Sequence, residues 1–142
     1  MAPPLVVIDT NVIVAALRSN RGASHQVLLS LGEDAYRMCV SVALLMEYEA
    51  AAMRLTRTTP LRRQDIDAIL DYVCSEARHC KVHFLWRPCL RDPNDDMVLE
   101  LAVSSGARYI ITHNTRDFAG TERFGIEALT PREFLPMIRR RR

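Results

Sequence analysis

Residues 5–14, LVVIDTNVIV, are the stretch that decides the fold of this chain. The first four, Leu5–Ile8, are uninterrupted apolar residues, which predicts a short strand buried on both faces of a sheet. The strand ends abruptly in a carboxylate, Asp9, and the polar residues Thr10 and Asn11 follow it. In an open parallel sheet, ligands collect at the carboxyl ends of the strands. Asp9 is therefore expected to point into a functional crevice.

Length and composition describe an ordinary folded domain. The chain has 142 residues, of which 49% are hydrophobic and 25% charged, so we expect one domain over residues 1–142. Its core should span about residues 5–135, with a basic tail over residues 136–142. No apolar run approaches the roughly 20 residues of a membrane span, and the first residues lack the pattern of a secretory signal. We expect a cytoplasmic protein without membrane contact.

Cysteines and net charge exclude little on their own. Four scattered cysteines, Cys39, Cys74, Cys80 and Cys89, have neither the spacing of a zinc site nor that of a disulfide framework. The net charge is +2, although all but one of the 19 basic residues are arginines. The arginines at positions 139–142 fit two interpretations, an RNA-binding tail or a solubilising end.

Predicted strands and helices alternate from one end of the chain to the other. Further strands are expected at residues 37–40, 81–85, 109–112 and 126–129. Helices are expected at residues 11–17, 24–32, 42–55, from Pro60 through Val73, 93–105 and from Pro131. This alternation predicts an α/β fold: a single three-layer domain whose four- or five-stranded, mainly parallel sheet is covered by helices on both faces.

Acids at strand ends and in helices could join Asp9. Glu47 and Glu49 lie among small and apolar neighbours of one helix, and the periodicity does not choose between them. Each of the two glutamates could equally well be an acid at the solvated edge of an amphipathic helix, without a role in a site. Asp95 lies in line with the buried apolar stripe of its helix. An alternative explanation is that acids in a first helical turn interact favourably with the helix dipole. Asp117 follows the fourth strand, where an aspartate often caps a turn.

Together, such carboxylates would form a metal site. Oxygen ligands without cysteine or histidine suit Mg²⁺ or Mn²⁺, and carboxylates that crowd together require a cation. A metal–carboxylate centre that faces basic residues is suited to phosphodiester hydrolysis, because the metal activates a water and neutralises charge on the phosphate. An aspartate-based phosphotransferase of the haloacid dehalogenase type is disfavoured, since Asn11 stands where a second aspartate is needed. Neither the acid pattern of a phospho-receiver nor a glycine-rich phosphate loop is present.

Four sequence motifs resemble the PIN domain nucleases, in particular the branch of toxin components related to the VapC-type toxins. The motifs are VVIDTNVIVAAL at residues 6–17, MEYEAAAMR at 46–54, RDPNDDMVLELAVSSGARYIITHNTRDF at 91–118 and LTPREFL at 129–135. Their order and spacing also match, so the resemblance covers nearly the whole chain. It implies a PIN-like fold and a metal-dependent ribonuclease.

The resemblance also implies which residues form the site. The family's four acids match Asp9, Glu47, Asp95 and Asp117, which selects Glu47 over Glu49. Thr10, Asn11 and Thr112 fall at polar positions that support those acids. The implied partners are Mg²⁺ or Mn²⁺, RNA, an antitoxin protein and a second copy of the chain.

One position departs from the family pattern. Asn114 stands where many members have aspartate, which puts the binding of a second metal in doubt. The departure keeps a second hypothesis open: a catalytically weak or inactive PIN-fold module that binds RNA or a partner protein.

Overall fold

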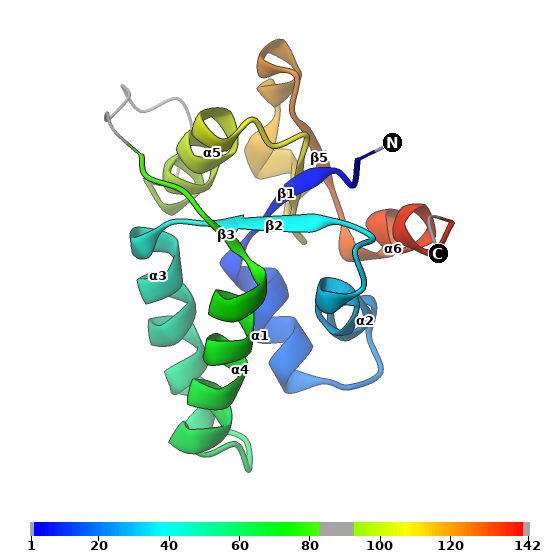
Figure 1. Ribbon diagram of the computed structural model, residues 1–142. Helices are drawn as coiled ribbons and strands as arrows, with labels where there is room; N and C mark the ends of the chain where they lie inside the picture. Colours follow the sequence, from blue (N-terminus) through cyan, green and yellow to red (C-terminus); the bar gives the residue numbers. More distant parts are fainter. Residues whose placement is uncertain (1, 83–92, 141–142) are drawn as a thin grey trace.

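A five-stranded parallel sheet forms the centre of the computed structural model, which describes residues 2–82 and 93–140 (Figure 1). The strand order is β3-β2-β1-β4-β5, and every neighbouring pair is parallel. The strands are β1 (Leu5–Ile8), β2 (Arg37–Val40), β3 (Arg78–His79), β4 (Tyr109–Ile111) and β5 (Glu127–Leu129). The α/β fold with a parallel sheet is confirmed.

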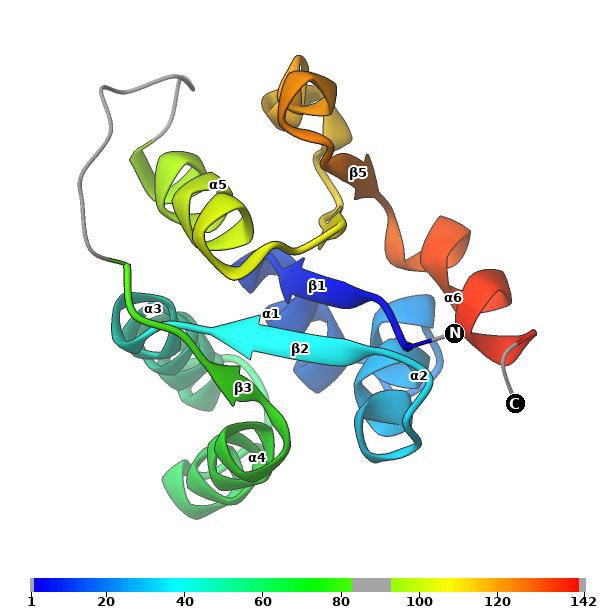
Figure 2. The ribbon, with the colours of Figure 1, turned by 45° about the horizontal axis from the view of Figure 1, so that its top comes forward.

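Helices cover both faces of this sheet. The α-helices are α1 (Thr10–Arg18), α2 (Ala23–Leu29), α3 (Val42–Met53), α4 (Arg63–Glu76), α5 (Pro93–Ser105) and α6 (Pro131–Arg139). The 3₁₀ helices are η1 (Ser30–Gly32), η2 (Arg54–Arg57), η3 (Thr115–Phe118) and η4 (Thr121–Phe124). In Figures 1 and 2, α5 lies on the face of the sheet opposite α1, α3 and α4.

The strand order creates a switch point between β1 and β4. From β1 the chain proceeds through β2 to β3 on one side, and then crosses by α5 to β4 on the other side of β1. Connections that leave in opposite directions open a crevice between the carboxyl ends of the two strands. Asp9 and Thr112 directly follow these two ends.

Apolar strands and local helix caps account for most of these elements. Val6, Val7 and Ile8 are fully buried, as expected for a central parallel strand. The Ser41 hydroxyl accepts a hydrogen bond from the Leu44 N–H at 3.1 Å and begins α3. The buried apolar side chains of β1, β2 and β4 form one core with those of the surrounding helices.

Two predicted boundaries were wrong. The third strand, predicted at residues 81–85, is Arg78–His79; Lys81 and Val82 are not in a strand, and residues 83–85 lie outside the described part of the chain. Helix α4 begins at Arg63 rather than Pro60. The Asp65 carboxylate accepts a hydrogen bond from the Arg62 N–H at 2.8 Å, which stabilises this later start.

The C-terminal helix extends the core further than predicted. Helix α6 continues to Arg139, and Ile138 is fully buried, so packing does not end near Leu135.

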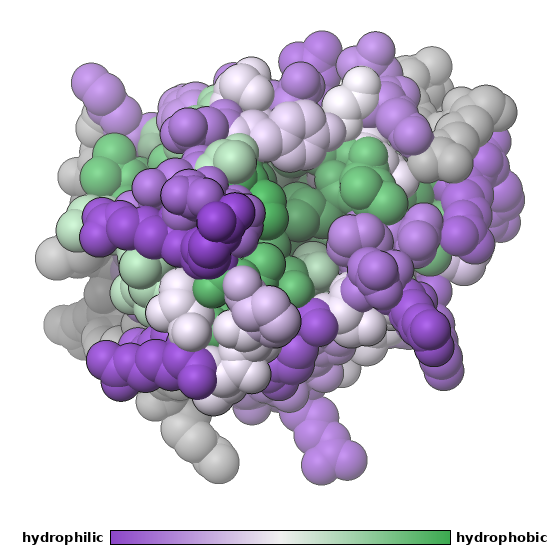
Figure 3. Space-filling view, turned by 90° about the horizontal axis from the view of Figure 1, so that it is seen from below, coloured by the Kyte–Doolittle hydropathy of each residue, from purple (hydrophilic) through white to green (hydrophobic). Residues whose placement is uncertain are grey.

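Within the described residues, no helix has the length and apolar character needed to cross a membrane. Figure 3 shows the face of the molecule that is seen from below the view of Figure 1. Apolar residues gather in the middle of that face, and polar residues surround them.

Candidate active site

Asp9 lies at the switch point and is only 9% exposed. Its N–H donates to the Ile111 carbonyl oxygen at 2.8 Å, which continues the β1–β4 pairing. Asp9 also occupies the N-cap of α1, yet its side chain makes no capping hydrogen bond. The carboxylate instead accepts a hydrogen bond from the Thr112 hydroxyl at 2.7 Å. Helix capping, the common structural role of aspartate at this position, therefore does not explain Asp9.

A hydrogen-bond network surrounds the Thr112 hydroxyl. Asn11 Nδ2 donates to Thr112 Oγ1 at 3.4 Å, and the Asn114 N–H donates to the same oxygen at 3.1 Å. Asn11 Oδ1 in turn accepts a hydrogen bond from the His113 N–H at 3.2 Å. These contacts join the segment after β1 to the segment after β4. They fix the position of the Asp9 carboxylate, because Thr112 is itself fully buried.

Tyr48 connects α3 to the same strand end. Its hydroxyl donates a hydrogen bond to the carbonyl oxygen of Ile8, and its side chain is fully buried. Burial raises the pKa of the Tyr48 hydroxyl, and the nearby Asp9 carboxylate raises it further. The neutral tyrosine therefore acts as a donor that holds α3 against β1.

Glu47 precedes Tyr48 and is partly buried, whereas Glu49 is exposed. Because α3 contacts both α1 and α5, the more buried acid lies on a helix that packs beside the switch point. The choice of Glu47 over Glu49, which the family resemblance implied, remains a prediction.

Asp95 and Asp117 lie on elements that also pack near the switch point. Asp95 is in the first turn of α5, which contacts β1, β4 and η3. Asp95 and its neighbour Asp96 are both partly buried, so burial does not distinguish between them. Asp117 is exposed in η3, and its N–H donates to the Asn114 carbonyl oxygen at 3.0 Å.

The described structure does not gather these acids into a closed cluster. Among residues 2–82 and 93–140, no three histidine, cysteine, aspartate or glutamate side chains lie close enough together to hold a metal ion. The structure shows the contact between Asp9 and Thr112, and it shows that α5, which carries Asp95, contacts β1 and β4 as well as α3 and η3, the elements that carry Glu47 and Asp117. The metal-binding set remains a prediction.

His113 was not among the predicted site residues. Its ring Nε2 and Ser24 Oγ form a hydrogen bond at 2.8 Å, although the two residues are 89 positions apart. Ser24, the first residue of the helix predicted at residues 24–32, is buried within α2, and Gly22 occupies the N-cap. The sequence places His113 just after a predicted strand, which could have marked it as a candidate site residue. Its partner Ser24 could not be identified from the sequence.

The protein is an α/β domain, and at the switch point of its sheet the Thr112 hydroxyl holds the Asp9 carboxylate by a hydrogen bond. The model of the PIN domain family matches residues 5–116 of this sequence. The chain therefore belongs to the PIN domain family. PIN domains are generally nucleases.

A solved structure shares this fold. It is described as the crystal structure of VapBC2 from Rickettsia felis bound to a DNA fragment from their promoter. The likeness covers 89% of this chain and 98% of the matched chain, with a TM-score of 0.59 and 14% sequence identity. A search of curated proteins found no match.

Proposed function

We propose that this PIN domain is a Mg²⁺- or Mn²⁺-dependent endoribonuclease and the toxin component of a toxin–antitoxin system. The observation that carries the proposal is the buried Asp9 carboxylate, which accepts a hydrogen bond from Thr112 and does not cap its own helix. A buried acid with this support at a switch point is typical of a functional group.

Asp9, Glu47, Asp95 and Asp117 would bind the metal. Their donors are all carboxylate oxygens, which suit Mg²⁺ and Mn²⁺. The bound ion would lower the pKa of a water and neutralise charge on the phosphate. Thr112 would keep the Asp9 carboxylate in place, and Tyr48 would hold the helix that carries Glu47.

The proposed partners are RNA, an antitoxin protein and a second copy of the chain, in the cytoplasm. The VapBC2 likeness supports an antitoxin, together with the resemblance of the motifs to VapC-type toxins. Large apolar side chains on the surface support protein partners: Val42 and Met46 of α3 are 75% and 67% exposed.

Cleavage of RNA by the purified protein tests the proposal. In the presence of Mn²⁺, the wild-type protein should cleave single-stranded or structured RNA, and Asp9→Asn should leave the same RNA intact. This control is needed because a contaminating nuclease would cleave in both samples. Equal cleavage by the wild type and Asp9→Asn would contradict the proposal.

Neighbouring acids supply matched controls for two further positions. Glu47→Gln should abolish most of the cleavage, whereas Glu49→Gln, two residues along the same helix, should retain it. Asp95→Asn and Asp96→Asn form an equivalent pair in α5. Each pair makes the same chemical change on one helix, so a general loss of helix stability would affect both members.

Two observations favour a second candidate, a PIN-fold module that binds RNA or protein without turnover. Asn114 stands at a position where many family members have aspartate, and the described acids form no group of three. Calorimetric titration with Mn²⁺ separates the candidates. A nuclease site should bind Mn²⁺ and lose binding in Asp95→Ala, whereas a non-catalytic module should show no difference between the two proteins.

A further inference from the structure

A cavity of about 340 Å³ lies beside the switch point, at the carboxyl ends of β4 and β5. Its polar lining residues are Ser19, Ser24, His113, Thr130 and Arg132, and we call it the Ser24–Arg132 cavity. The order β1-β4-β5 arranges the segments that follow these strands along one edge of the sheet. Asp9, His113 and Arg132 therefore succeed one another along this edge.

His113 connects the cavity to the candidate active site. Its backbone N–H donates to Asn11 Oδ1, and it directly follows Thr112, the donor to Asp9. On its other side, the imidazole is hydrogen-bonded to Ser24, which is 4% exposed. The ring is thus held between the active-site network and the wall of the cavity.

The charge of the cavity favours an anion. Arg132 lines it, and no acidic side chain does so among the described residues; the exposed Glu133 carboxylate accepts a hydrogen bond from the lining residue Thr130. Arg21 lies in the loop between α1 and α2, adjacent to the lining residue Gly22, and is exposed. Guanidinium, imidazole and hydroxyl groups can all donate hydrogen bonds to phosphate oxygens.

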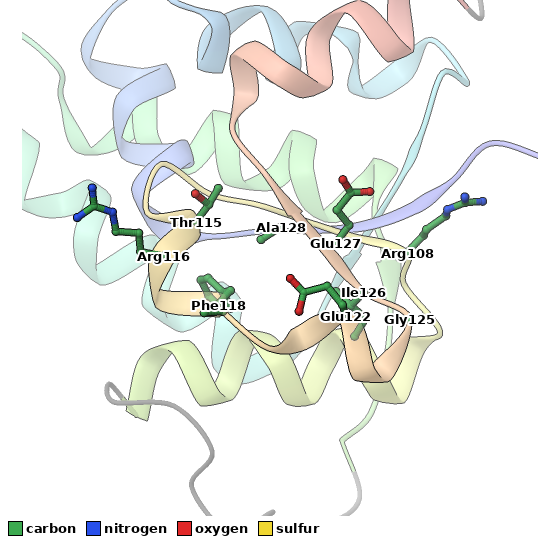
Figure 4. A pocket seen from close by; sticks show the side chains of 10 residues that line it. Arg108, Thr115, Arg116, Phe118, Glu122, Gly125, Ile126, Glu127 and Ala128 are labelled. Atoms are coloured by element: carbon green, nitrogen blue, oxygen red, sulfur yellow. The ribbon is translucent and has the colours of Figure 1, made fainter.

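Three other hollows in the described structure differ in charge or in position. One of them, lined by Arg108 and Arg140, is also basic, but it lies at the amino ends of β1 and β4. The cavity between η3, η4 and β5 is larger, about 600 Å³, but Glu122 and Glu127 offset Arg108 and Arg116 in its lining (Figure 4).

The groove between α3 and α4 is lined by acids and by no basic side chain among the described residues. Its acids are Glu49, Asp67 and Asp71. Phosphates would be repelled from this groove. The Ser24–Arg132 cavity combines a basic lining with a connection to Asp9 through His113 and its neighbour Thr112.

We propose that the Ser24–Arg132 cavity is an RNA subsite that binds a phosphate next to the bond to be cleaved. Arg132 contacts the phosphate, and His113, held by Ser24, positions the nucleotide that leads toward Asp9. The proposal rests on the proposed function, since it takes RNA as the substrate. It adds the direction of the bound strand, from Asp9 past β4 toward the start of α6.

Binding of RNA without turnover tests this subsite. The protein carries Asp9→Asn, no divalent metal is added, and the probe is a short fluorescein-labelled single-stranded oligoribonucleotide followed by anisotropy. Arg132→Gln should weaken binding roughly tenfold. The slope of log affinity against log salt should become shallower by about 0.7, the value for one lost phosphate contact on a single strand.

Matched variants separate a contact from a general charge effect. Arg123→Gln removes the same charge from exposed η4 and should leave affinity and slope unchanged, while Arg132→Lys should keep the slope. Ser24→Ala, checked for folding by thermal unfolding, should weaken binding without a change of slope, because no charge is lost. Equal effects of Arg132→Gln and Arg123→Gln would overturn the subsite, and unchanged binding in Ser24→Ala would overturn the role of His113.

The outcome is independent of cleavage. If the wild-type protein cleaves RNA but Arg132→Gln binds normally, the subsite is overturned and the nuclease stands. If no cleavage occurs but Arg132→Gln makes the salt slope shallower, the cavity stands as a phosphate-binding site for RNA, and both the nuclease and the placement of this phosphate next to a cleaved bond are overturned.

Discussion

At the scale of single residues, the hydrogen bond between Thr112 and Asp9 joins the two strands at the switch point. Thr112 is fully buried and Asp9 nearly so. In a buried site, a carboxylate that loses a donor keeps its full desolvation penalty, and its orientation is less restricted. The bond therefore serves the stability of the fold as well as the position of the proposed metal ligand.

Thr112→Val, which keeps the shape of the side chain, should lower the free energy of unfolding by about 1 to 3 kcal/mol. The loss arises because Asp9 and the Asn114 N–H lose a buried partner. Urea denaturation measures it. Thr58→Val, in an exposed turn, is the control and should change stability by less than about 0.5 kcal/mol. Equal stability of the two variants would show that the Asp9 contact contributes nothing.

Two buried tyrosines make stability depend on alkaline pH. Tyr36 donates a hydrogen bond to the Val27 carbonyl oxygen at 2.7 Å, and Tyr48 donates to that of Ile8. Burial raises the pKa of both hydroxyls. Above pH about 10 the unfolded chain releases protons that the folded chain retains, so stability falls as pH rises.

Tyr48→Phe should make this fall shallower by about 1.4 kcal/mol per pH unit, the value for one proton. Unfolding measured at a series of pH values above about 10 tests the difference. Burial also raises the pKa of the Cys39 thiol to about 11, but this contribution is common to both proteins and cancels. Parallel curves for the wild type and Tyr48→Phe would contradict the prediction.

At the scale of elements, α6 depends on a capping box. The Thr130 hydroxyl accepts a hydrogen bond from the Glu133 N–H at 3.1 Å, and the Glu133 carboxylate accepts one from the Thr130 N–H at 3.0 Å. The helix predicted to begin at Pro131 is confirmed. The cap also orients the turn that carries Arg132 toward the proposed RNA subsite.

Thr130→Ala should destabilise the protein by about 1 kcal/mol, because the Glu133 N–H loses its acceptor and the hydroxyl no longer donates to the Glu133 carboxylate. Thr130→Ser keeps the hydroxyl and should remain near the wild-type stability. Thermal or urea unfolding compares the three proteins. A loss in Thr130→Ser as large as that in Thr130→Ala would assign the effect to the methyl group instead of the cap.

At the scale of the whole molecule, exposed apolar side chains favour self-association. Val42 and Met46 project from α3, and Leu29 of α2 is 57% exposed. Sedimentation equilibrium should give a mass of twice the 16.2 kDa of one chain. A mass of one chain at all concentrations measured would exclude the homodimer.

The sequence by itself determined the class of fold and the position of the first acid. Apolar runs alternate with helical stripes, and a strand ending in Asp9 places a carboxylate at the edge of a parallel sheet. It could not locate β3, because Arg78–His79 is an exposed pair without an apolar run. It could not locate the start of α4 either, where the contact of Asp65 with Arg62 prevailed over the proline signal.

The tertiary structure decided which residues meet. Thr112 reaches Asp9 across 103 positions, and His113 reaches Ser24 across 89. Local patterns specify strands and helices but leave the order of the strands open, and that order decides which strand ends become neighbours. With β4 beside β1 and β5 beside β4, residues from distant motifs share one edge. The support of Asp9 and the cavity beside it are therefore consequences of the strand order in the sheet.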